Sequence, residues 1–334
     1  MSDLEMGDGL SDSSSYNNAH RAFLQAFLAR SVMTTDEIKP LLAAIMSAHE
    51  PDRPLLVGDI TPPDITNFIQ QVNIRISPLD YEIRSSRSQT SRVLFYSLVN
   101  TTSDSLTHLA TTFSHEEIAY IKRLLDCMFE TNNTRSREIM AVSSMEASRL
   151  TKAPRENRQS LAAANGDGED GAQSQAAAAV KGISISESDK VLAQLVEQHF
   201  FNKSSRGYYS LAPRALMELR VYLKETYNEA GDPEYEDSEP IVRIKDCEGC
   251  REIVTVGVRC SDKECRVRFH EQCAVLYFRN QRGDTQRCPT CKTEWGGNLF
   301  VGERAVYQGE RRANGTGAGR HSSSRVQVDD EDED

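Results

Sequence analysis

The hydrophobic pattern of the first hundred residues predicts three helices followed by a β-hairpin. Apolar residues recur at helical spacing in three segments, at 20–30, 38–46 and 62–73. Alternating apolar residues then predict two strands, at 79–83 and 92–99, joined by a polar loop. Three short helices followed by a hairpin are typical of a winged-helix domain, which we place at residues 19–134.

A second, weaker copy of this pattern follows. Ser114 and Glu117 form a capping-box sequence, and we assign the helix that it opens to the end of the first domain. A short helix is predicted around 138–150, a helix begins at Ser186, and a hairpin turns near Gly207. We therefore predict a second winged-helix domain at residues 135–230. Its segment 151–182 is rich in Ala, Gly, Asp and Gln, and we expect a disordered insertion there.

Composition and charge are informative mainly about the ends of the chain and the linker between domains. The net charge is −11, and the last six residues are all acidic. We expect residues 1–18 and the acidic tail 302–334 to be disordered, with an acidic linker at 231–240. No apolar run approaches the ~20 residues of a membrane span, so we expect no membrane association.

The cysteines are the most informative residues of the chain, because seven of the eight fall between Cys247 and Cys291. The first residues carry no apolar core typical of a secretion signal, so clustered thiols favour metal binding over disulfides. Together with His270 they form four ligand pairs, enough for two tetrahedral zinc ions. In the cross-brace order of RING-type domains, the first and third pairs share one ion, and the second and fourth share the other. The predicted zinc-one ligands are Cys247, Cys250, His270 and Cys273, and the zinc-two ligands are Cys260, Cys265, Cys288 and Cys291.

Both predicted sites are saturated by protein ligands, which leaves no position for an activated water. We therefore expect two structural zinc ions in a small domain at residues 241–301, and no covalent catalytic residue. Cys127 lies outside this set, on the apolar stripe of its helix, and we interpret it as a buried core thiol.

Two kinds of closed two-zinc module fit this spacing. The four-residue gap between Cys260 and Cys265 also fits a plant-homeodomain finger, which reads histone tails. Pro289 between the last two cysteines favours a RING, and Gln286 stands where histone-reading fingers usually place an aromatic residue. A RING acts by positioning a charged ubiquitin-conjugating enzyme. The candidate docking residues are Leu276, Phe278, Pro289 and Lys292, with Tyr277 on the same predicted helix.

One feature departs from the RING pattern. Many RINGs carry a bulky apolar residue between their first two cysteines, whereas this chain has Glu248 and Gly249. This departure favours a non-enzymatic assembly subunit, whose zinc domain is purely an interface, over a ligase. The sequence leaves both hypotheses open, together with the weaker one of a histone-tail reader.

Several short strings make the chain resemble a known family. They include His20–Gln25, Tyr96–Thr101, Leu109–Thr111 and Gly207–Leu211, and they end in the variant RING and Trp295. In this order they resemble the non-SMC element one subunit of the SMC five/six chromosome-maintenance complex.

The resemblance implies an α+β protein with tandem winged helices that bind a MAGE-like winged-helix subunit, which in turn contacts a kleisin subunit. It also implies a nuclear, chromosome-associated role in DNA repair and recombination, and ubiquitin-ligase activity that depends on the partner. The insertion at 151–182 departs from the family pattern.

Winged helices often bind DNA, but this chain offers little for that purpose. The predicted third helix carries no Lys or Arg before Arg75, so it is a poor reader of phosphates and base edges. Arg84, Arg87 and Arg92 around the first hairpin are the residues that could touch a DNA backbone. We expect direct DNA binding to be weak or absent, and protein docking to be the use of both domains.

Overall fold

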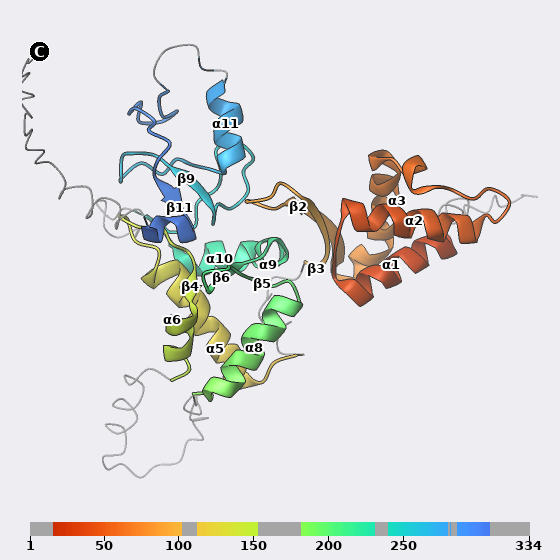
Figure 1. Cartoon of the computed structure of the whole chain (residues 1–334), viewed down its shortest axis with the longest axis horizontal. Helices are drawn as coiled ribbons and strands as arrows, with labels where there is room; N and C mark the ends of the chain where they lie inside the picture. The colour runs from red at the N-terminus through yellow and green to blue at the C-terminus, as the bar shows by residue number, and fades with distance from the viewer. Residues whose placement is uncertain are drawn as a thin grey trace, which may run out of the picture.

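The computed structural model of the chain has three lobes arranged around a common junction (Figure 1). It describes residues 16–101, 112–152, 182–230, 240–279, 281 and 286–307. The disorder predicted for the first fifteen residues, for most of the insertion and linker, and for the tail beyond Tyr307 lies outside these residues. No helix in the described part of the chain has the length and apolar character needed to cross a membrane.

The first lobe is a winged helix with a core of its own. Its sheet has the strand order β1-β3-β2, with both pairs antiparallel. Thr34 caps α2 by accepting a hydrogen bond from the Glu37 backbone N–H, while the Glu37 carboxylate accepts one from the Thr34 backbone N–H at 2.7 Å. The helix runs through Pro40. The elements are α1 (Asn18–Arg30), β1 (Val32–Thr34), α2 (Thr35–His49), α3 (Pro62–Ile76), β2 (Tyr81–Arg87) and β3 (Leu94–Asn100).

The second lobe repeats the same order of elements around a different core. Its sheet has the order β4-β6-β5, again antiparallel. Capping boxes begin α5 at Ser114, α6 at Ser143 and α8 at Ser184. The elements are α5 (His115–Asp126) with a π-helical turn at Cys127–Thr131, β4 (Val142–Ser143), α6 (Ser144–Arg149), α8 (Ile185–Glu197), β5 (Phe201–Lys203), β6 (Tyr208–Leu211), α9 (Pro213–Glu218) and α10 (Arg220–Tyr227).

This arrangement moves two boundaries that the sequence placed differently. The apolar face of α5 packs in the second core, so the helix opens the second winged helix and does not close the first. Tyr120 shows this directly, since its hydroxyl donates to the Ala147 carbonyl at 3.0 Å. The helix predicted around 138–150 begins only at Ser144, because the preceding residues are extended and Glu138 forms a β-bridge with Val301.

The third lobe is the zinc-ligand region, and it shares one continuous hydrophobic core with the second lobe. Its central sheet has the order β10-β9-β11. The chain is ordered past residue 302, where the sequence predicted a tail, because β11 pairs with β9 and Gly302 N–H donates to the Glu138 carbonyl at 2.7 Å. The elements are β7 (Asn228–Glu229), β8 (Ile241–Val242), β9 (Gly257–Arg259), β10 (Arg268–Phe269), α11 (Glu271–Arg279) and β11 (Phe300–Val301).

The β2–β3 hairpin, the wing of the first lobe, reaches across to the other two lobes (Figure 1). At its tip, Gln89 donates from its amide nitrogen to the Ile253 carbonyl at 2.8 Å. Its amide oxygen accepts from the backbone N–H groups of Thr255 at 3.0 Å and Val256 at 2.7 Å. One side chain therefore joins the first winged helix to the zinc-ligand region.

Candidate metal centre and its surroundings

The first ligand group gathers the residues predicted for zinc one. Cys247, Cys250, His270 and Cys273 present ligand atoms that all lie within 4.8 Å of one another. The two cysteines of the first pair come from the loop after β8, and the other two ligands come from the end of β10 and the first turn of α11. His270 Nδ1 lies 3.3 Å from Cys250 Sγ, so this nitrogen faces the thiol group. The opposite ring nitrogen, Nε2, lies 3.2 Å from the Ile253 carbonyl, which holds the ring orientation.

The second group gathers the residues predicted for zinc two. The sulfurs of Cys260 and Cys291 are 3.4 Å apart, and those of Cys265 and Cys288 are 3.6 Å apart. A tetrahedral ion with Zn–S bonds of about 2.3 Å separates its sulfurs by roughly 3.8 Å. These distances and the all-sulfur donor set fit zinc, and the four ligands close the coordination shell. The pairing of first with third and second with fourth is the cross-brace order.

Local hydrogen bonds and glycines shape the ligand loops. A Cβ at Gly249 would lie 2.9 Å from Cys273 Cβ, so only glycine fits between the two halves of the first site. A Cβ at Gly257 would lie 2.2 Å from the Phe269 carbonyl oxygen, which requires glycine where β9 meets β10. The Thr293 hydroxyl lies 3.3 Å from Cys291 Sγ, and this contact lowers the pKa of the Cys291 thiol to about 6. The contact therefore favours the thiolate form that binds metal.

Glu138 anchors the zinc-ligand region to the second winged helix. Its side chain is 1% exposed, and its carboxylate accepts two hydrogen bonds from Arg268 and one from Lys245, all at 2.6 Å. Burial alone would raise the pKa of Glu138, but the hydrogen bonds and charge of Arg268, then Lys245 and Arg259, hold it at about 2. The carboxylate is therefore ionised at neutral pH, and the junction depends on a buried ionic cluster.

The helix α11 has one face in an aromatic core and another in solvent. Phe278 packs against Trp295 with ring centroids 4.9 Å apart, and both rings contact Phe269. Phe278 is only 4% exposed, so its predicted role in docking is wrong: the side chain supports the helix from beneath. Leu276 is 56% exposed and its neighbour Val275 is 61% exposed, which leaves an apolar strip on the outer face.

The other two candidate docking residues lie in the loop that holds the last pair of ligands. Pro289 is half-buried and Lys292 is exposed. Lys292 has a positive φ of 61°, and its ammonium group donates to the Pro289 carbonyl at 2.6 Å. The loop therefore holds the cation close to Cys288 and Cys291 rather than leaving it to move freely.

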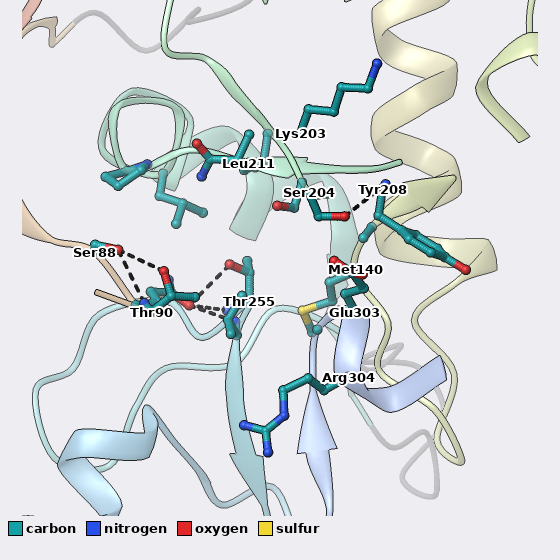
Figure 2. Close-up of a pocket in the computed structure, with 18 of the residues that line it drawn as sticks. Ser88, Thr90, Met140, Lys203, Ser204, Tyr208, Leu211, Thr255, Glu303 and Arg304 are labelled. Carbon is teal, nitrogen blue, oxygen red and sulfur yellow. Dashed lines mark hydrogen bonds between the residues drawn. The ribbon is translucent and has the colours of Figure 1, made fainter. Parts of the chain in front are cut away.

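A cavity of about 700 Å³ lies where the three lobes meet. The hairpin tip of the first lobe contributes Ser88 and Thr90, the second lobe contributes Ser204, and the zinc-ligand region contributes Thr255. Figure 2 shows the side chains of Lys203 and Arg304 at the edges, directed away from this group of hydroxyls. The cavity is thus a gap between lobes with a mixed polar and apolar lining, and Lys203 and Arg304 do not converge on a ligand in it.

Three residues of this region were not predicted from the sequence. Glu138 and Gln89 lie in segments with no metal or catalytic motif, and Arg268 lies between two zinc ligands but is not one of them. The partners of all three lie more than a hundred residues away in the chain. Sequence spacing identifies ligands that are close along the chain, but it carries no signal for such distant pairs.

Two winged helices followed by a closed two-zinc cross-brace define a class of protein, the tandem winged-helix proteins with a C-terminal RING-like domain. Residues 20–219 match the family model described as Nse1 non-SMC component of SMC5-6 complex, and residues 247–291 match a RING-like domain. The chain belongs to this Nse1 family.

Relatives and a solved structure agree with this assignment. The chain is 22% identical to the human protein named non-structural maintenance of chromosomes element 1 homolog, over 83% of this chain and 84% of that protein. It is 24% identical to the Saccharomyces cerevisiae element 1 protein, over 66% of each chain. A chain of a solved structure titled Nse1-Nse3-Nse4 complex has a TM-score of 0.60 at 20% identity, covering 85% of this chain and 99% of that one. These comparisons confirm the resemblance and the fold class predicted from the sequence.

Proposed function

We propose that this chain is a RING-type ubiquitin-protein ligase subunit of the SMC5-6 complex, and that it acts in the nucleus in DNA repair and recombination. The observation that carries the proposal is the apolar strip of Val275 and Leu276 on α11, on a RING-like domain whose last ligand is followed by Lys292. An exposed apolar strip can hold a ubiquitin-conjugating enzyme by its surface, and a cation held in the last ligand loop of the same domain can bond to it. Catalysis then consists of positioning the ubiquitin thioester, which needs no covalent residue of this chain.

The two winged helices would bind the partners of the complex. The structural relative is titled Nse1-Nse3-Nse4 complex, which supports a MAGE-like Nse3 partner and a kleisin Nse4 partner for this chain also. Exposed Met145 on α6 and Ile185 at the start of α8 offer apolar surface on the second winged helix. Co-purification of this chain with the MAGE-like subunit, with and without the kleisin, tests this assembly.

The ligase proposal is tested with the zinc-loaded full chain, alone and with its MAGE-like partner, against a panel of conjugating enzymes. We expect partner-stimulated ubiquitin chain formation, abolished by Cys288→Ala and reduced about 10-fold or more by Leu276→Ala or Lys292→Ala. Leu79→Ala and Lys122→Ala are matched controls, because both positions are exposed and lie outside the zinc-ligand region. Activity that is unchanged in Leu276→Ala and Lys292→Ala would contradict the docking surface.

A second candidate is a non-enzymatic assembly subunit. Gly249 is required by its close approach to Cys273, so the first ligand loop cannot place a bulky apolar residue there, and Phe278 is buried. Both facts narrow the apolar surface for a conjugating enzyme to Val275, Leu276 and Tyr277 on α11 and to Pro289. A folded, zinc-loaded complex that is inactive with every conjugating enzyme would favour this candidate.

A further inference from the structure

Arg259 is a buried cation whose surroundings need an explanation. Its side chain is 4% exposed, and none of its three guanidinium nitrogens has a hydrogen-bond partner among the residues that the structure describes. Its nearest carboxylate oxygen is Glu138 Oε1, at 3.7 Å. Burying a charged group without hydrogen bonds is costly, so a nearby negative charge is needed to offset it.

Glu138 cannot supply that charge by itself. Its two oxygens already bind Arg268 and Lys245 at 2.6 Å. Lys245, Arg259 and Arg268 carry three positive charges against the single negative charge of Glu138, so this cluster has a net charge of +2. Since the three side chains are 15%, 4% and 2% exposed, water does little to screen the excess charge.

The tetracysteine site has the opposite charge. Four thiolates and one Zn²⁺ sum to −2, and two of these ligands, Cys260 and Cys265, lie in the segment that joins β9 to β10. Arg259 directly precedes Cys260, and it stands opposite Arg268 in the antiparallel pair of β9 and β10. Arg268 in turn donates to the Cys265 carbonyl at 2.8 Å. The cationic cluster and the second zinc site are therefore neighbours of equal and opposite charge.

We propose that Arg259 is a positioning residue that supplies counter-charge to the tetracysteine zinc. The +2 cluster and the −2 site form a neutral buried unit at the junction of the second winged helix and the RING-like domain. When this zinc leaves and the four thiolates take up protons, the site becomes neutral and the +2 cluster around Glu138 is left uncompensated. Retention of the metal and integrity of the junction therefore depend on each other. The first zinc site, with three thiolates and one neutral histidine, carries only −1, and Arg259 is adjacent in the chain to a ligand of the second site alone.

The test compares zinc release from the full chain in Arg259→Met, Arg259→Lys and the parent. A chromogenic chelator gives the release rate, and mass spectrometry of alkylated cysteines identifies which site opens. We expect Arg259→Met to release one zinc about 10-fold faster, with alkylation at Cys265 and Cys288 before Cys250 and Cys273. Arg259→Lys keeps the charge, so its release rate should stay within about 3-fold of the parent. Arg266→Met, at an exposed arginine of the same domain, is the matched control.

The lysine variant separates charge from shape. If Arg259 served only to fill space, lysine would fail as methionine does, and both would release zinc faster than the parent. Equal release from Arg259→Met and the parent, or equal loss from both zinc sites, would overturn the proposal. If Arg259→Met does not fold, Arg259→Lys carries the test alone: retention of zinc two supports the proposal, and its selective loss refutes it.

Discussion

Replacing Glu138 with glutamine tests whether the buried ionic cluster stabilises the junction. The substitution keeps the size of the side chain and removes its charge, leaving Arg268 and Lys245 without their carboxylate. The pKa of Glu138 falls from its ordinary value of 4.5 to about 2 on folding. This lowering means that the ionised carboxylate contributes roughly 3 kcal/mol to the free energy of folding. Because the folded pKa is lowered, this contribution is fully present above about pH 4.5 and is lost as the pH falls toward 2.

The second winged helix and the RING-like domain share one core, so we expect them to unfold together. Urea denaturation of the zinc-loaded chain at pH 7 should therefore show a free energy of unfolding about 3 kcal/mol lower for Glu138→Gln in that transition. The transition of the first lobe, which has its own core, should not move. Glu264→Gln is the control, because its ion pair with Arg135 is exposed and is worth at most about 1 kcal/mol. A loss below about 0.5 kcal/mol for Glu138→Gln would refute the reasoning.

Three further results are expected. Gln89→Ala removes the hydrogen bonds that the Thr255 and Val256 amides donate to the wing, which are worth roughly 1 kcal/mol each. Hydrogen exchange at these two amides should therefore speed up by about 30-fold, and unchanged protection would contradict the contact. Burial raises the pKa of the Cys127 thiol to about 11, so its alkylation at pH 8 should be about 100-fold slower in the native than in the unfolded chain, as mass spectrometry can measure. Phe278→Ala should cost about 3–5 kcal/mol in thermal or urea unfolding, and equal stability of this variant and the parent would contradict its place in the core.

The zinc ligands could be predicted from the sequence because their chemistry is local. A two-residue gap between cysteines places both sulfurs on one ion whatever the rest of the chain does. The first winged helix could also be predicted, since its helices and strands follow one another without interruption and each has a clear apolar stripe. In both cases the information lies within a few neighbouring residues.

Features that depend on distant partners could not be predicted. The apolar stripe of α5 was visible, but nothing in it says which core it enters, so the helix was assigned to the wrong winged helix. In α11 the consecutive residues Val275, Leu276, Tyr277 and Phe278 are all apolar or aromatic, and the period alone cannot say which of them faces solvent. The structure separates Leu276 on the surface from Phe278 in the core.

The position of the first wing bears on the question of DNA binding. The tip of a wing can approach a DNA backbone only if it is free, and here Gln89 holds the tip against the RING-like domain. Arg84 on the same hairpin is paired with Glu82 at 2.8 Å, which reduces its net charge toward phosphate. DNA binding by this wing would first have to break the Gln89 contacts, at a cost of a few kcal/mol. The geometry therefore favours protein docking as the use of this winged helix. If a Gln89→Ala variant gained salt-sensitive affinity for DNA, the wing would be able to bind DNA and only restrained by the Gln89 contacts.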